Sequence, residues 1–115
     1  MSLESFKDLI AWQVSMELAR EVYSWTRRMP KEHRYEIASQ MNRSAISIPA
    51  NIAEGYGRRN RGEYLQFLGI ARGSATELET LCILAVQLEL GSGEVVLELI
   101  QRSQKLLWKL EKSLE

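Results

Sequence analysis

The chain has 115 residues, of which 45% are hydrophobic and 26% are charged, and its formal net charge is zero. This apolar content excludes an intrinsically disordered protein and is typical of a soluble globular chain that folds around a core, with a length that suits one domain over residues 1–115. The neutral balance excludes a protein that binds polyanions through its overall charge.

The first segment, residues 4–29, has the apolar spacing of a helix. Trp12, Met16, Ala19 and Tyr23 recur at intervals of three and four, which predicts that they share one helical face. More apolar residues widen that face beyond the needs of one bundle contact and indicate a second contact surface: Leu9, Leu18, Val22, Trp25 and Met29. The residue before a proline is pushed out of helical geometry, so the helix should end before Pro30.

The second segment, residues 31–56, is also predicted to be helical. Its apolar residues recur at spacings near three and four: Tyr35, Ile37, Ala38, Met41, Ala45, Ile48, Ile52 and Ala53. Pro49 lacks a backbone donor and clashes with the preceding turn, so we expect a kink or a break there. Ser47 and Asn51 flank Pro49 and can supply hydrogen bonds to the freed backbone groups.

Two further helices complete the pattern. Asn60 and Glu63 form a capping pair for a third helix that extends to Leu90, and apolar residues repeat there every seven positions. Gly91 and Gly93 flank the turn to a fourth helix, which has an apolar stripe ending at Leu114. Four helices joined by short turns predict an all-α, up-down-up-down four-helix bundle.

The sequence offers little for catalysis or for metal binding. It has one histidine, one cysteine and one aspartate, whereas the carboxylate-bridged metal sites of helical bundles need two Glu-x-x-His pairs. His33 is interpreted as a solvated turn residue and Cys82 as a buried, inert thiol. We therefore expect no catalytic residue, no metal and no cofactor. No apolar run is long enough for a membrane helix and the first residues lack a signal peptide, which favours a cytoplasmic protein.

A polar stripe runs along the second predicted helix and has a counterpart on the third. Its members are Gln40, Arg43, Ser47, Asn51 and Glu54, followed by Arg72, Ser74, Glu77 and Glu79. One interpretation is a solvated face with ordinary ion pairs. The other is a hydrogen-bonded network between helices or subunits that fixes their register, for example through an ion pair between Arg43 and a third-helix glutamate.

Basic residues are concentrated in the middle of the chain. From Arg20 to Arg72 there are ten Lys or Arg and five Glu, and the remainder reverses this balance with five basic and ten acidic residues. Two clusters lie at predicted turns, and they are Arg27, Arg28, Lys31 and Arg34 at the first turn and Arg58, Arg59 and Arg61 at the second. Each cluster is either a solvated turn or a set of contacts to nucleic-acid phosphates.

Three motifs resemble the bacterial four-helix bundle family that is named for open reading frames inside intervening sequences of large-subunit ribosomal RNA genes. They are Phe6-x-x-Leu9-x-x-Trp12-Gln13, Gln40-Met41-x-Arg43-Ser44-x-x-Ser47-Ile48-Pro49-x-Asn51-Ile52-Ala53-Glu54-Gly55 and Ala71-Arg72-Gly73-Ser74-x-x-Glu77-Leu78-Glu79. The resemblance implies a four-helix bundle that assembles into a homopentameric ring. It also implies kinship with the accessory protein of diversity-generating retroelements, a strongly basic barrel that binds nucleic acid and a reverse transcriptase, whereas this chain is neutral.

Two functions are consistent with these features. The first is a non-enzymatic, oligomeric scaffold that binds RNA or DNA, or a protein acting on nucleic acid, through its basic turns. The second is an adaptor that binds another protein and has no nucleic-acid role. An enzyme acting through Glu54 or Glu77 is a more distant third.

Overall fold

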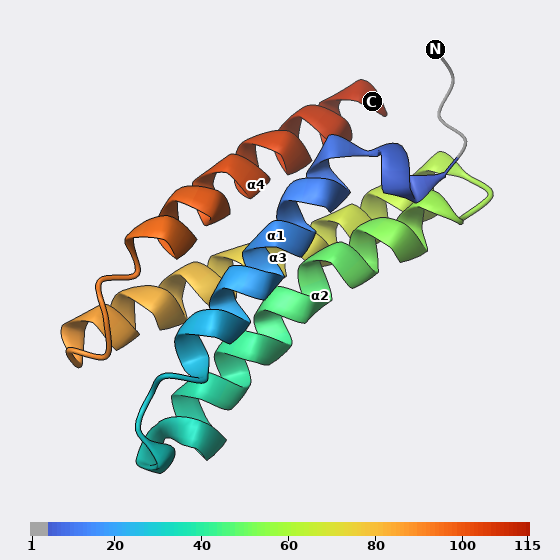
Figure 1. The fold of residues 1–115 in the computed structure, drawn as a ribbon. Coiled ribbons are helices and arrows are strands. Elements are labelled where there is room, and N and C mark those ends of the chain that lie inside the picture. The colour runs from blue at the N-terminus through green and yellow to red at the C-terminus, as the bar shows by residue number, and fades with distance from the viewer. Residues whose placement is uncertain (1–4) are drawn as a thin grey trace.

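The computed structural model describes residues 5–115 and contains four long helices (Figure 1). These are α1 (Ile10–Thr26), α2 (Ser39–Tyr56), α3 (Arg61–Gln87) and α4 (Glu94–Ser113). Short helical turns precede α1 and α2, namely η1 (Phe6–Asp8), η2 (Lys31–His33) and η3 (Arg34–Ala38). The described part of the chain contains no strand, so the prediction of an all-α four-helix bundle is confirmed.

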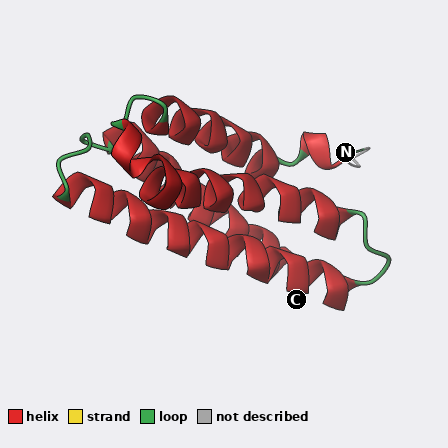
Figure 2. Cartoon of the chain, turned by 90° about the horizontal axis from the view of Figure 1, so that it is seen from below, coloured by secondary structure: helices red, strands yellow, loops and turns green. Residues whose placement is uncertain are grey.

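The four helices pack in the order of the chain around the bundle. α1 packs against α2 and α4, and α3 packs against the same two neighbours. The connections α1–α2 and α3–α4 lie at one end of the bundle, and the connection α2–α3 lies at the other (Figures 1 and 2). We call the first of these the Pro30 end, defined by residues 27–38 and 88–93. The two basic turns are therefore at opposite ends of the molecule.

The core of the bundle is formed by one stripe from each helix. The large side chains that are fully buried include Leu18, Met41, Ile48, Ile52, Leu68, Leu78, Ile100 and Leu107. Truncating one of these leucines or isoleucines to alanine typically costs about 2–5 kcal/mol, because a cavity remains. α3 contributes small residues to the core as well, including Ala71, Ala75 and Ala85, which let its neighbours approach closely.

The buried stripe of α1 and the face shared by Trp12, Met16, Ala19 and Tyr23 are different faces of the helix. Val14, Leu18, Val22 and Trp25 form its buried stripe, whereas Tyr23 is 59% exposed. Trp12, Met16 and Ala19 are only partly buried. Both stripes satisfy a spacing of three and four, and only the positions of α2 and α4 decide which one faces inward.

Two predicted boundaries also differ from the structure. Leu9 has an extended conformation (φ −73°, ψ 124°) and separates η1 from α1, while the predicted start at Glu4 lies outside the described residues. Of the kink or break expected at Pro49, the break does not occur, since α2 continues through this proline and the irregular turns η2 and η3 lie before α2 instead. Asn51 Nδ2 donates to the backbone oxygen of Ser47 at 2.8 Å, beside this proline.

A tight turn joins α3 to α4 at the Pro30 end. α3 ends at Gln87, three residues before the predicted end, because the backbone turns at Glu89 with φ 61°. Leu90 N donates to Ala85 O at 2.9 Å and Glu89 N donates to Val86 O at 3.0 Å, which is the Schellman pattern of helix termination. The indole of Trp25 packs on Gly91 and Gly93 and fixes this turn against α1.

Candidate nucleic-acid interface

The Pro30 end exposes four cations close together in sequence. Arg27 is the C-cap of α1, Lys31 lies in η2 and Arg34 begins η3, and the three residues are exposed, as is Arg28. None of their side chains forms an ion pair or a hydrogen bond within residues 5–115. We call these four residues and Tyr35 the Pro30 corner. An unpaired, solvated cation can bind a phosphate without first losing a protein partner.

Tyr35 is the feature of this corner that sequence reasoning missed. The apolar spacing of the second segment placed it on the core face, but its side chain is 85% exposed. Tyr35 lies in η3, a π-helical turn whose buried residues are Ile37 and Ala38. Its spacing of three from Ala38 therefore does not place it on the buried face, and no sequence signal identifies the π turn. An exposed aromatic ring at the same end of the bundle as these cations is suited to stacking on a nucleic-acid base.

In the second basic turn, at the opposite end, Arg58 contacts other side chains of the subunit. Arg58 Nη2 lies 3.7 Å from Glu54 Oε1, and its guanidinium sits 4.6 Å above the centre of the Phe67 ring. Arg59 and Arg61 are exposed and have no ion-pair partner in the described chain. Within one subunit this turn cannot join the Pro30 corner, because the length of the bundle separates them (Figure 1).

The polar stripe forms a short seam between α2 and α3. Ser74 Oγ is 2.8 Å from Ser47 Oγ, and Asn51 Nδ2 donates to the same Ser47 hydroxyl at 2.9 Å. One turn closer to the Pro30 end, Ser44 Oγ lies 3.0 Å from Glu77 Oε1 and 2.8 Å from the backbone oxygen of Gln40. These hydroxyl and amide contacts link α2 to α3 at matched levels and so define the register of the pair.

Arg43 and Glu54 lie outside this seam. The expected ion pair between Arg43 and a third-helix glutamate is absent from the described residues, because Ser44 rather than Arg43 faces Glu77. Arg43 instead lines a cavity of about 190 Å³ at the outer edge of the seam. Glu54 contacts Arg58 within its own turn.

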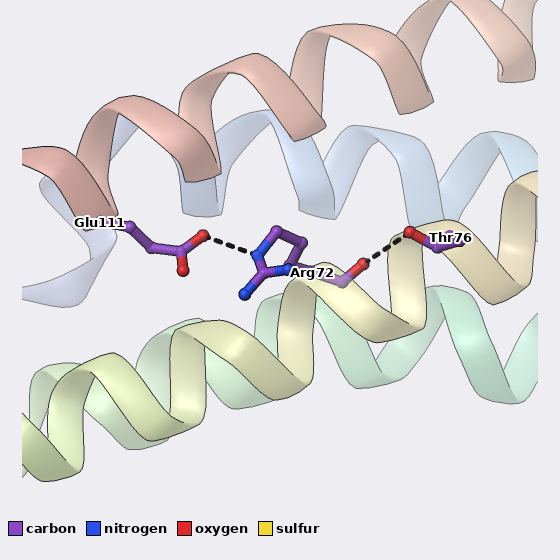
Figure 3. A network of polar contacts seen from close by, with 3 residues as sticks. All are labelled: Arg72, Thr76 and Glu111. Atoms are coloured by element: carbon purple, nitrogen blue, oxygen red, sulfur yellow. Dashed lines mark hydrogen bonds and ion pairs between the residues drawn. The ribbon is translucent and has the colours of Figure 1, made fainter.

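Arg72 connects α3 to α4 rather than to α2. Its Nε donates to Glu111 Oε1 at 3.0 Å, and its backbone oxygen accepts from Thr76 Oγ1 at 3.2 Å (Figure 3). Farther along the same pair of helices, Gln104 Nε2 donates to Glu79 Oε1 at 3.3 Å. The polar side chains of α3 therefore form hydrogen bonds to both α2 and α4.

Two side chains that are buried or partly buried have raised pKa values. Burial raises the pKa of the Cys82 thiol to about 12, with a smaller contribution from the negative charge of Glu79. The pKa of Tyr64 is raised by burial and by the neighbouring Tyr56. Within residues 5–115, no three His, Cys, Asp or Glu side chains are grouped closely enough to hold a metal ion. None of the helices described is long and apolar enough to cross a bilayer.

Comparison with known proteins gives one family and a structural relative. The family of 23S rRNA-intervening sequence proteins matches residues 7–112 of the chain. A crystal structure from Bacteroides thetaiotaomicron, of a protein with unknown function from the S23 ribosomal protein family, is 26% identical to this chain with a TM-score of 0.84. The match covers 92% of this chain and 98% of the other. The sequence matches none of the curated proteins with which it was compared. Because the family match spans nearly all of the bundle, the chain belongs to the family of 23S rRNA-intervening sequence proteins.

Proposed function

We propose that this protein is a non-enzymatic, oligomeric scaffold that binds single-stranded RNA through its basic turns, chiefly at the Pro30 corner. The observation that supports this most is the combination of four unpaired cations with the 85%-exposed ring of Tyr35. The cations suit the backbone phosphates, and the ring suits an unpaired base that can leave its stack. A duplex keeps its bases stacked, so it would use the cations alone.

An oligomer would compensate for the small number of cations in one subunit. Four phosphate contacts on a neutral chain give weak binding, and a symmetric assembly repeats the same corner in every copy. Arg59 and Arg61 would be repeated in the same way at the opposite end. RNA is tested before DNA because its single strands and loops present unstacked bases to an exposed aromatic ring.

The test is fluorescence anisotropy with a labelled 20-nucleotide single-stranded RNA over a range of salt concentrations. For the double variant Arg28→Gln/Lys31→Gln we expect weaker binding and a salt slope that is less steep by about 0.7 for each phosphate that the variant no longer neutralises. The matched control is Lys105→Gln/Lys109→Gln, which removes two exposed cations from α4. Equal affinities for the two double variants would refute the proposal.

A protein-binding adaptor is the second candidate function. It is supported by large apolar side chains that remain exposed on the subunit, among them Tyr23, Ile46 and Trp108. An adaptor without a nucleic-acid role should pass through a heparin column at low salt and should bind the labelled RNA no better than the double variant does.

A further inference from the structure

The outer surface between α1 and α2 is an apolar groove with basic edges. Its volume is about 360 Å³, and it is lined by Met16, Ala19, Tyr23 and Ile46, together with Ser24, Asn42, Arg20 and Arg27. Tyr23 and Ile46 are 59% and 61% exposed, so two large side chains protrude there without an intramolecular partner. An exposed apolar surface with a charged rim is typical of a protein contact.

A second unpartnered surface covers the outer face of α3. Opposite its buried stripe, this helix exposes three large apolar side chains, Ile70, Ile83 and Leu84, and Leu88 is exposed at its C-cap. Between them lie Gly73, Thr76 and Thr80, which are exposed and small. A methyl group added at Gly73 would meet no heavy atom within 4 Å, so nothing in the subunit requires glycine at this mid-helix position. Glycine there destabilises the isolated helix relative to alanine.

The two surfaces carry opposite charge. Residues 20–43, which include the basic edges of the groove, contain six Lys or Arg and three Glu. Residues 73–89, which include most of the exposed α3 face, contain three Glu and no Lys or Arg. Arg20 and Arg27 form no ion pair within the described subunit, and neither do Glu77 and Glu89. These charges are free to pair between molecules.

The two surfaces also lie at the same height along the bundle. Thr26 contacts Asn42 across α1 and α2, and Ser47 contacts Ser74 across α2 and α3. Counting along the antiparallel helices from these contacts places Tyr23 and Ile46 level with the stretch of α3 near Gly73 and Thr76. In a ring whose axis runs parallel to the bundle, neighbouring copies meet at equal heights.

From this match in polarity, charge and height, we infer that the α1–α2 groove of one copy packs on the α3 outer face of a second copy. The protruding Tyr23 and Ile46 then cover the small residues around Gly73, and the groove arginines lie against the glutamates of residues 73–89. Because the two faces differ, the contact is heterologous, and repetition closes into a ring when the rotation permits. This inference rests on the oligomeric part of the proposed function and assigns its interface.

The test uses one variant for each face. Ile46→Asp places a charge in the groove, and Gly73→Leu fills the space over α3, where the subunit itself has room for the side chain. We expect each variant to remain a folded helical protein and to self-associate with a dissociation constant raised about 30-fold or more. Val95→Asp is the matched control, because Val95 is 56% exposed and lies outside both faces, on the side lined by Glu21 and Arg28.

Mixing the two variants separates a heterologous contact from other arrangements. Each variant keeps one intact face, so an equimolar mixture should form dimers in light scattering while neither variant does so alone. Wild-type assembly by Gly73→Leu would overturn the inference, and so would a mixture that stays monomeric. A monomeric wild type that still binds the labelled RNA would overturn this interface and leave RNA binding intact. An assembled protein that does not bind the RNA would refute RNA binding and leave this interface intact.

Discussion

Trp25 packs on the α3–α4 turn and donates a hydrogen bond to it, a contact that we call the Trp25 clamp and that gives the sharpest stability prediction. Trp25 is 5% exposed, and its Nε1 donates to the backbone oxygen of Leu90 at 2.8 Å. Trp25→Phe leaves that buried oxygen without a partner, which costs about 1–3 kcal/mol, and removes part of the ring packing, which costs about 1 kcal/mol. We therefore expect the free energy of unfolding to fall by about 2–4 kcal/mol.

A double-mutant cycle tests the geometry behind this value. A Cβ at Gly93 would lie 2.7 Å from Cη2 of Trp25, and Gly93 has φ 64°. In the wild type, Gly93→Ala thus adds a steric clash of about 1–3 kcal/mol to the backbone strain of about 1 kcal/mol. In the Trp25→Phe background the clash with the indole is relieved, whereas the strain and a 3.1 Å contact with Val86 Cγ2 remain. Urea unfolding followed by circular dichroism at one protein concentration measures the four species. Additive effects within about 0.5 kcal/mol would refute the clamp.

Three other predictions concern the interior and the same turn. Ser103 is buried and its hydroxyl has no partner among residues 5–115, so Ser103→Ala should leave the free energy of unfolding unchanged or raise it by about 1 kcal/mol, and a lower urea midpoint would contradict this. The folded state raises the pKa of the Cys82 thiol to about 12, so the free energy of unfolding should be unaffected by this group below pH 9 and should fall by up to about 1.4 kcal/mol per pH unit as pH rises toward 12. In Cys82→Ala, urea titrations should lack this fall in stability with pH. The same fall in the variant would exclude Cys82 as its cause. Glu89→Gly relieves a left-handed backbone and should raise the melting temperature by a few degrees, whereas a decrease would show that the Glu89 side chain stabilises the turn.

The helices could be predicted because their signals are local. Asn60 Oδ1 accepts from Glu63 N at 2.8 Å, as its position in the sequence indicates, and Pro30 separates α1 from η2. Pro49 was less predictable, since a proline disrupts one turn and the packing of Ile48 and Ile52 in the core keeps α2 continuous around it.

The candidate site depended on geometry that the sequence does not encode locally. The arginines of the first turn are visible in the sequence, but the π turn that carries Tyr35 outward is not. The partner of Glu77 is Ser44 rather than Arg43 because the choice depends on the rotation of α2 against α3, which follows from packing along the whole length of both helices.

Light scattering on a sizing column, with absorbance recorded at 260 and 280 nm, measures subunit number and bound nucleic acid together. If an assembled form of this protein carries RNA at the Pro30 corner, we expect a discrete oligomer that carries ribonuclease-sensitive material at low salt and releases it at high salt. An oligomer that neither carries RNA nor binds added single strands at low salt, or a monomer under every condition, would contradict it.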